Sequence, residues 1–189
     1  MSFADPPAAA AWRHVDASDG FEVVFCERAG DGWRVRGHVA AVEDGVPWAV
    51  DYEIVVDAAW ATRLARVTAH AEGGTAATRL EADGGGAWTV DGAPAPAVAG
   101  CRDVDLEASA FTNAFPIHRL ALARGAAADA PAAYVRAPGL AVERLEQRYE
   151  SLGGGRFRYA SPAFGYEAVL AYDDAGLIVD YPGIAVRAL

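Results

Sequence analysis

Two carboxylates spaced two residues apart, Asp103 and Asp105, are the side chains of this sequence best placed to do chemistry. If residues 101 to 106, CRDVDL, form a strand, its period of two puts both acids on one face, about 7 Å apart. Such a pair can divide general acid and general base work when their environments separate their pKa values. The pair can also form a solvated sheet face, which is the simpler interpretation.

The segment that follows, EASAFTNAFPIHRL, is rich in residues that build loops. Thr112 and Asn113 have short side chains that bond local backbone, and Pro116 cannot donate a ladder hydrogen bond. Such a loop could simply cap a sheet edge. It could also aim Asn113, His118 and Arg119 into a cavity, where arginine offers a planar fork to carboxylate, phosphate or sugar hydroxyl groups.

The elements that must position these residues are predicted to be short antiparallel strands. Period-two alternation marks them: in GWRVRGHVAAV, Trp33 and Val35 point one way while Arg34 and Arg36 point the other. About a dozen such strands are too many for one flat sheet, so we expect an all-β fold with a rolled or barrel-like sheet. Asp-Gly favours tight hairpin turns, and five such pairs lie between apolar runs: Asp19-Gly20, Asp31-Gly32, Asp44-Gly45, Asp83-Gly84 and Asp91-Gly92.

Three segments are harder to assign. Residues 141–152 combine helical spacing of apolar residues with strand-like alternation, and periodicity alone leaves both structures open. Residues 57–63, DAAWATR, could form a helical turn capped by Asp57. The Ala-rich residues 123–139 are predicted to form a surface loop between strands.

Composition bounds the class of protein. The 189 residues are 53% hydrophobic and 22% charged, which predicts a globular protein with a single domain over residues 1–189. A net charge of -10 repels nucleic acid and anionic membrane surfaces. All sixteen basic residues are arginine, which excludes Schiff-base and P-loop lysine chemistry.

Neither targeting nor membrane insertion is predicted. The N-terminal residues 1–20 have an alanine run but neither a basic leader nor a long apolar core, unlike a signal peptide. No apolar stretch approaches the roughly 20 residues that cross a bilayer. We therefore expect a cytoplasmic protein without stable membrane insertion.

Signatures of metal, redox and standard hydrolase chemistry are missing from the sequence. Cys26 and Cys101 lie in apolar, strand-like surroundings and are expected to be buried thiols. There is no G-x-S-x-G, H-E-x-x-H or C-x-x-C motif, and His14, His38 and His70 lack ligand spacing. We predict neither a metal site nor a cofactor.

The run GCRDVDLEASAFTNAFPIHRL, together with QRYESL and GLIVDYPG, resembles the bacterial putative glycolipid-binding family, formerly an uncharacterised domain family. The family signature reads approximately as an Asp-x-Asp strand, a Ser-Pro-Phe-Thr-Asn-Thr-Leu-Pro-Ile loop and an Arg-Arg-Leu strand. The residues that match it are Asp103, Asp105, Phe111, Thr112, Asn113, Pro116, Ile117, Arg119 and Leu120. The departures are Ala110 for the first Pro, Ala114 for the second Thr, Phe115 for Leu and His118 for the first Arg.

The resemblance covers nearly the whole chain and implies both a fold and a ligand. It implies a many-stranded spiral β-roll, similar to the open half-barrels that carry lipids or lipoproteins. It further implies a glycolipid or another small amphipathic ligand, and it favours strand structure over residues 141–151.

A rolled sheet offers an apolar concavity for acyl chains, and a few polar groups at its mouth can fix a head group. Loss of an arginine at His118 would weaken any contact with an anionic head group at neutral pH. The candidate head-group contacts are Asp103, Asp105, Asn113, His118 and Arg119. The candidate wall residues are Tyr149, Tyr159, Tyr166 and Tyr181, each of which could equally be a core position with its hydroxyl at the surface.

Three functions are compatible with these residues. The first is a non-catalytic carrier that holds the amphipathic ligand in its cavity. The second is an enzyme acting on a sugar or lipid conjugate, with Asp103 or Asp105 as acid or base, His118 as proton carrier and Arg119 as anion clamp, and it requires these groups to converge. The third is a protein-interaction domain, which predicts a large exposed apolar patch and a collapsed interior.

Overall fold

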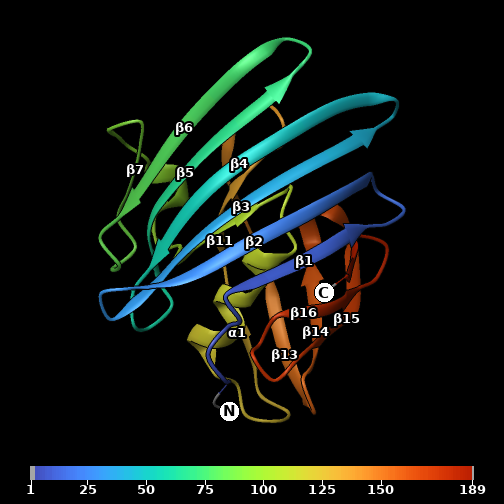
Figure 1. The fold of residues 1–189 in the computed structure, drawn as a ribbon. Helices are drawn as coiled ribbons and strands as arrows, with labels where there is room; N and C mark the ends of the chain where they lie inside the picture. Colours follow the sequence, from blue (N-terminus) through green and yellow to red (C-terminus); the bar gives the residue numbers. More distant parts are fainter. Residues whose placement is uncertain (1–2, 189) are drawn as a thin grey trace.

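The computed structural model describes residues 3–188, which form mainly antiparallel strands (Figure 1). Fourteen strands of this range make one sheet, in the order β10-β13-β14-β15-β16-β17-β1-β2-β3-β4-β5-β6-β7-β8, and three make a second, in the order β12-β11-β9. The strands are β1 Ala9–His14, β2 Asp19–Ala29, β3 Gly32–Glu43, β4 Val46–Val56, β5 Thr62–Ala71, β6 Gly74–Ala82, β7 Trp88–Val90, β8 Ala93–Pro94, β9 Asp103–Leu106, β10 Ala127–Asp129, β11 Ala132–Val135, β12 Val142–Leu145, β13 Arg148–Gly153, β14 Arg156–Ser161, β15 Tyr166–Tyr172, β16 Ile178–Tyr181 and β17 Ala185–Arg187. The helical elements are the 3-10 turns η1 Pro96–Val98, η2 Phe111–Asn113 and η3 Pro162–Phe164 and the helix α1 Ala114–Leu120.

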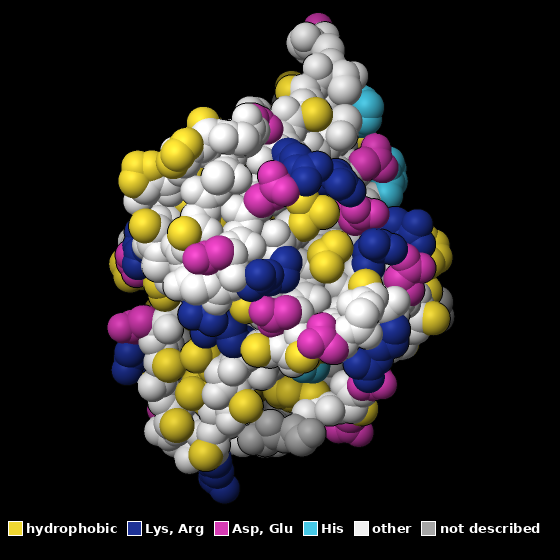
Figure 2. Space-filling model, turned by 90° about the vertical axis from the view of Figure 1, so that its left-hand side faces the viewer, with side chains coloured by type: hydrophobic (Ala, Val, Ile, Leu, Met, Phe, Trp, Pro, Cys, Tyr) yellow, Lys and Arg dark blue, Asp and Glu magenta, His cyan; other side chains and the backbone are white. Residues whose placement is uncertain are grey.

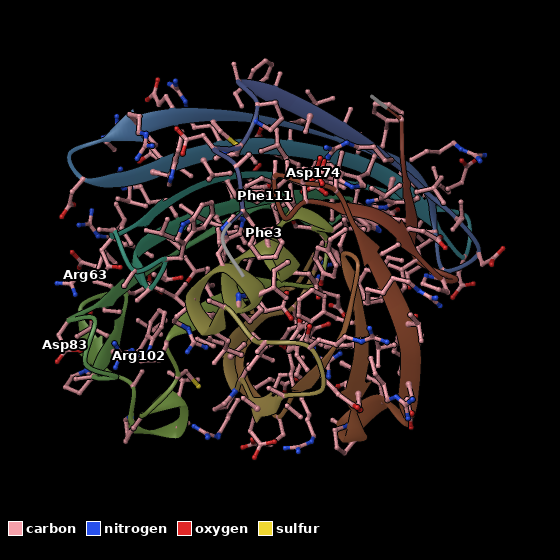
Figure 3. The ribbon with its side chains drawn as sticks, turned by 90° about the horizontal axis from the view of Figure 1, so that it is seen from below. Phe3, Arg63, Asp83, Arg102, Phe111 and Asp174 are labelled. Carbon is pink, nitrogen blue, oxygen red and sulfur yellow. The ribbon has the colours of Figure 1, made fainter. Side chains whose placement is uncertain are left out.

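The large sheet curves around the interior of the protein. Seen from below in Figure 3, its strands arch over α1 and continue down the other side as the C-terminal strands. The predicted all-β fold, with a rolled antiparallel sheet and little helix, is confirmed. The predicted domain, residues 1–189, includes residues 1, 2 and 189, which lie outside the described residues.

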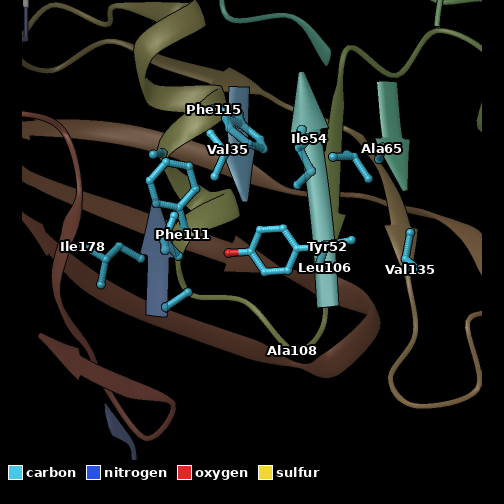
Figure 4. Packing of buried hydrophobic residues seen from close by; sticks show 14 of the residues in the cluster. Val35, Tyr52, Ile54, Ala65, Leu106, Ala108, Phe111, Phe115, Val135 and Ile178 are labelled. Carbon is cyan, nitrogen blue, oxygen red and sulfur yellow. The ribbon is translucent and has the colours of Figure 1, made fainter. Parts of the chain in front are cut away.

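The predicted alternation of buried and exposed residues holds along the central strands. On β3, Trp33 and Val35 are buried while Arg36 is exposed. On β4, Tyr52 and Ile54 point inward, where they pack beside Phe111, Phe115 and Leu106 in one hydrophobic core (Figure 4). The inner face of the large sheet therefore packs directly on α1 and on β9.

The exposed face of the sheet carries many charged residues. On the side of the molecule shown in Figure 2, acidic and basic side chains are interspersed with hydrophobic ones. Ion pairs join neighbouring strands, as between Arg66 on β5 and Glu53 on β4, whose Nη1 and Oε1 atoms lie 2.6 Å apart. Such exposed pairs contribute little to stability individually.

Two of the five Asp-Gly pairs form the predicted tight hairpin turns. Asp44-Gly45 joins β3 to β4 with φ angles of 51° and 80°, and Asp91-Gly92 joins β7 to β8 with φ angles of 50° and 81°. Positive φ at both central residues is what such turns require, and Asp-Gly tolerates it.

The other three hairpin predictions were misplaced. The turn between β2 and β3 is Gly30-Asp31, one residue earlier than predicted, and Asp19-Gly20 begins β2. Asp83 starts a wider turn in which its Oδ1 atom accepts hydrogen bonds from the N–H groups of Gly85, Gly86 and Ala87. An aspartate can thus order a loop through its side chain without forming a hairpin turn.

The segment predicted to be a loop and then a strand is helical. η2 spans Phe111–Asn113 and runs directly into α1, Ala114–Leu120. Pro116 fits in the first turn of α1, where its missing N–H would have no intrahelical partner. His118 and Arg119 therefore project from a helix that the sheet encloses.

The three segments that were hard to assign from the sequence have different structures. Residues 141–152 lie mostly in strands β12 and β13, as the family resemblance implied. Residues 57–63 form no helical turn, although Asp57 Oδ1 does accept hydrogen bonds from the N–H groups of Ala59 and Ala61. The predicted surface loop was wrong, because residues 123–139 contain the fully buried β11, which pairs in parallel with β9.

Both cysteines, Cys26 and Cys101, are buried and unpaired, as predicted. Burial raises the pKa of the Cys26 thiol to about 12 and that of the Cys101 thiol to about 11, so both stay protonated at neutral pH. No helix within residues 3–188 has the length and apolar character needed to cross a membrane.

Candidate functional site

A cavity of about 320 Å³ opens between β9, the segment that follows it and the C-terminal strands. Residues 105–110 and Asn113 line it, together with aromatic residues of β14, β15 and β16. The predicted site residues that line it are Asp105, Asn113, Tyr159, Tyr166 and Tyr181. The structure thus brings together five of the nine predicted contacts from distant parts of the chain.

Asp105 supplies a carboxylate to the cavity from β9. Its Oδ1 atom accepts a hydrogen bond of 2.7 Å from the Thr112 hydroxyl, and its Oδ2 atom accepts one from the Gln147 side-chain amide. Burial raises the pKa of Asp105 to about 6, while these two bonds oppose the shift. The carboxylate is therefore mostly ionised at pH 7 and is held in a fixed orientation by neutral donors.

Asn113 lines the cavity at the junction of η2 and α1. Its Oδ1 atom accepts a 3.0 Å hydrogen bond from the hydroxyl of Tyr149, and its backbone carbonyl accepts one of 3.5 Å from Tyr172. Tyr149 itself is fully buried and does not line the cavity. Tyr149 is therefore a core residue, but its hydroxyl is buried against Asn113 and not at the surface as that interpretation expected.

Three tyrosine rings form an aromatic wall across the cavity. Tyr159, Tyr166 and Tyr181 contact one another with ring centroids 5.9 to 6.0 Å apart. The Tyr166 hydroxyl donates a 2.6 Å hydrogen bond to the carbonyl oxygen of Pro182, which fixes its ring. The strands β14, β15 and β16 are neighbours in the sheet, so their alternation brings these rings to one face.

Asp103 and Arg119 form an ion pair with each other. Asp103 is 2% exposed, and Arg119 donates two hydrogen bonds to it, from Nε to Oδ1 and from Nη2 to Oδ2. Burial raises the pKa of Asp103, and the bonds from Arg119 oppose that rise. The pair joins α1 to β9, and neither residue lines the cavity.

His118 also points away from the cavity. Its ring stacks on Trp60 with centroids 3.7 Å apart, and its Nε2 atom donates a 2.9 Å hydrogen bond to the Ala175 carbonyl oxygen. Burial lowers the pKa of His118 to about 4, so the ring is neutral at pH 7. Of the residues that the enzyme hypothesis names, Asp103, Asp105, His118 and Arg119, only Asp105 lines the cavity.

Sequence reasoning missed Glu22, a fully buried carboxyl on β2. It accepts hydrogen bonds from the Tyr52 hydroxyl at 2.6 Å, from the Ser109 hydroxyl and from the Ala110 N–H at 2.8 Å. Burial raises the pKa of Glu22, and the hydrogen bonds oppose the rise. The alternation in DGFEVVFC predicts the wrong buried face. The face that carries Phe21 and Phe25 is the more apolar one, and yet it is exposed while Glu22 is buried.

Two further cavity residues, His14 and Trp48, were not predicted. His14 lies 3.0 Å from the Ser18 hydroxyl through its Nδ1 atom, and burial lowers its pKa. The indole N–H of Trp48 is buried without a hydrogen-bond partner in the described part of the chain. Across residues 3–188, no cluster of three or more His, Cys, Asp or Glu side chains could hold a metal ion.

Comparison with known proteins identifies two similarities. A family model described as "Putative glycolipid-binding" matches residues 9–187. The fold is also similar to the crystal structure of a DUF1089 family protein from Pseudomonas aeruginosa, with a TM-score of 0.78. That similarity has 32% sequence identity and covers 99% of this chain and 96% of the other. No curated protein matches the chain.

Proposed function

This chain belongs to the putative glycolipid-binding family, and we propose that it is a non-catalytic carrier that binds a small amphipathic ligand in the cavity beside Asp105. The observation that carries this proposal is the composition of the cavity wall. Asp105 and Asn113 contribute polar groups to it, and Tyr159 and Tyr181 contribute aromatic rings. A ligand with a polar head and an apolar body matches such a composition.

The size of the cavity supports a ligand that is only partly enclosed. At about 320 Å³, the cavity is at the small end of the range for ligand pockets, about 300 to 1,000 Å³. It suits one sugar ring or a short stretch of acyl chain. We therefore infer that the rest of a glycolipid would extend past the half-exposed ring of Phe164 at the cavity edge.

The predicted site residues divide into two groups under this proposal. Asp105, Asn113, Tyr159, Tyr166 and Tyr181 would contact the ligand directly. Asp103, His118, Arg119 and Tyr149 would act only by holding α1 and the aromatic wall in place, because their partners are other protein groups.

The two alternatives receive less support. The enzyme hypothesis requires His118 and Arg119 to converge in one pocket with Asp103 or Asp105. Arg119 and Asp103 pair with each other outside the cavity, and His118 makes its contacts with Trp60 and Ala175. The interaction-domain hypothesis predicts a large exposed apolar patch and a collapsed interior. Phe21 and Phe25 are exposed on β2, but the cavity does not correspond to a collapsed interior. We keep the predictions of a cytoplasmic location and of no nucleic-acid partner as parts of the proposal, the latter because of the net charge of -10.

Mass spectrometry of an organic-solvent extract of gently purified protein tests the proposal. Heat-stripped protein and an unrelated protein of similar size serve as controls. We expect a lipid or glycolipid in reproducible, near-stoichiometric amount from the native sample only. An extract that matches the controls, combined with no uptake of added alkyl glycosides, would overturn the proposal.

A further inference from the structure

The charged groups that line the cavity are acidic. Asp105, Glu43 and Glu107 contribute to its wall, and none of the arginines in the described residues does. Glu107 is neutralised by Arg136, whose Nη1 atom lies 3.0 Å from its Oε1. Asp105 and Glu43 take part in no ion pair within residues 3–188. An anionic head group would therefore meet uncompensated negative charge here.

Asp105 has unused hydrogen-bonding capacity. Its two carboxylate oxygens offer about four acceptor sites, and the protein donors Thr112 and Gln147 fill two of them. Both donors are neutral, so they orient the carboxylate without balancing its charge. A partly buried carboxylate without a counter-ion is costly to keep, and a bound cation would offset that cost.

The aromatic wall provides a second feature that favours positive charge. The rings of Tyr159, Tyr166 and Tyr181 line the cavity and contact one another, with centroids about 6 Å apart. A cation within about 6 Å of such ring faces is attracted by their quadrupoles. The carboxylate and the rings line the same cavity, so one positive group could contact both.

Trp48 indicates a different requirement on the ligand. Its side chain lines the cavity and is 8% exposed, yet its indole N–H has no acceptor in the described part of the chain. A buried donor without an acceptor is uncommon and unfavourable. A ligand hydroxyl or carbonyl oxygen would satisfy it.

We propose that the head group bound in this cavity is an amino sugar, or a chemically similar group that carries both a protonated amine and hydroxyl groups. The amine contacts Asp105 and the tyrosine rings, and a hydroxyl oxygen accepts from Trp48. This inference rests on the proposed function and narrows it, because it assigns the charge of the head group.

Two octyl glycosides that differ in one group test the inference. Octyl glucosaminide carries a 2-amino group where octyl glucoside has a hydroxyl, and both are titrated calorimetrically into the full chain at pH 7 and constant salt. We expect the glucosaminide to bind at least about tenfold more tightly, since hydrogen bonds to charged groups are among the stronger ones. Octyl glucoside 6-phosphate, whose head group is anionic, should bind more weakly than either.

Substitutions locate the charge recognition. Asp105→Asn should reduce the preference for the glucosaminide to less than about threefold, whereas Glu72→Gln, which removes an exposed charge on the turn between β5 and β6, should preserve it. Tyr166→Leu should weaken the preference by about threefold and Tyr166→Phe should not, because only the first removes a ring. This second pair decides the question even if Asp105→Asn does not fold.

The possible failures are distinguishable. Equal affinity for the two glycosides, or a preference that survives both Asp105→Asn and Tyr166→Leu, would overturn the inference and leave the proposed carrier function intact. Binding of neither glycoside would count against the carrier function itself.

Discussion

The guanidinium of Arg119 donates two hydrogen bonds to the carboxylate of Asp103, from Nε at 2.9 Å and from Nη2 at 2.6 Å. Both residues belong to the run from which a head-group site was predicted. Because Asp103 is 2% exposed, the pair is a buried salt bridge that connects β9 to α1. The conspicuous polar chemistry of this run thus serves largely to hold a short helix inside a rolled sheet.

Arg119→Met should destabilise the protein by about 3 to 5 kcal/mol, because it leaves the buried Asp103 carboxylate without its partner. Urea unfolding at pH 7 measures the change. Arg148→Met is the matched control, since it breaks an exposed ion pair with Asp129 and should cost less than about 1 kcal/mol. Equal small losses for both variants would show that the internal pair has no structural role.

His118 should make the protein sensitive to acid. Its pKa is lowered from 6.5 to about 4, so below pH 6.5 the unfolded chain binds a proton that the folded protein does not accept until the pH nears 4. Stability should therefore fall across this range, by up to about 3 kcal/mol from this residue.

The variant His118→Phe tests whether His118 causes the predicted loss of stability at low pH. It keeps a ring beside Trp60 but cannot titrate, and it gives up the bond to the Ala175 carbonyl oxygen. We expect a lower stability at pH 7 and a shallower decline between pH 6.5 and pH 4 in unfolding measured at several pH values. A decline as steep as that of the parent protein would rule out His118 as its cause.

Glu22 should have the opposite dependence on pH. Because its folded pKa is raised above the ordinary value of 4.5, the unfolded chain releases the proton first, and stability falls as the pH rises above 4.5. Glu22→Gln should remove this decline while keeping an acceptor for the Tyr52 hydroxyl.

The corresponding apolar variant, Glu22→Leu, separates hydrogen bonding from charge. It leaves the Tyr52 hydroxyl and the Ala110 N–H without their acceptor and should destabilise the protein by about 2 to 4 kcal/mol at every pH tested. Urea unfolding between pH 4.5 and pH 8 compares the two variants. If Glu22→Gln retained the pH dependence of the parent, a different group would be responsible.

The strands could be predicted from the sequence because they obey a local rule. Alternation fixes which side chains of β3 and β4 face inward, and the turns at Asp44-Gly45 and Asp91-Gly92 need only two residues. α1 could not be predicted in this way, since seven residues with a proline and no polar face show no helical pattern. β11 was not predicted as a strand because its alanines have little strand preference. Its burial between β9 and β12 decides its structure.

The candidate site was predictable only in part. Asp105 and Asn113 were identified from the residue types and spacing of the run around them, and both match the family signature. Trp48 and His14 reach the cavity through the curvature of the sheet, which leaves no local signal. Glu22 is an exception to the rule that acidic side chains face solvent. The donors at Ser109 and Ala110 that allow its burial lie about ninety residues away in the chain, so no local pattern indicates it.

Titration of octyl glucoside into the parent protein and a cavity-filling variant tests most directly whether the cavity binds an amphipathic ligand. Ile184→Trp places a large ring at a half-buried position that lines the cavity, and Val179→Trp places the same ring at an exposed position outside it. We predict saturable binding by the parent and by Val179→Trp, and at least tenfold weaker binding by Ile184→Trp with its fold intact. Equal affinity in all three proteins would place the ligand elsewhere and contradict a carrier function for this cavity.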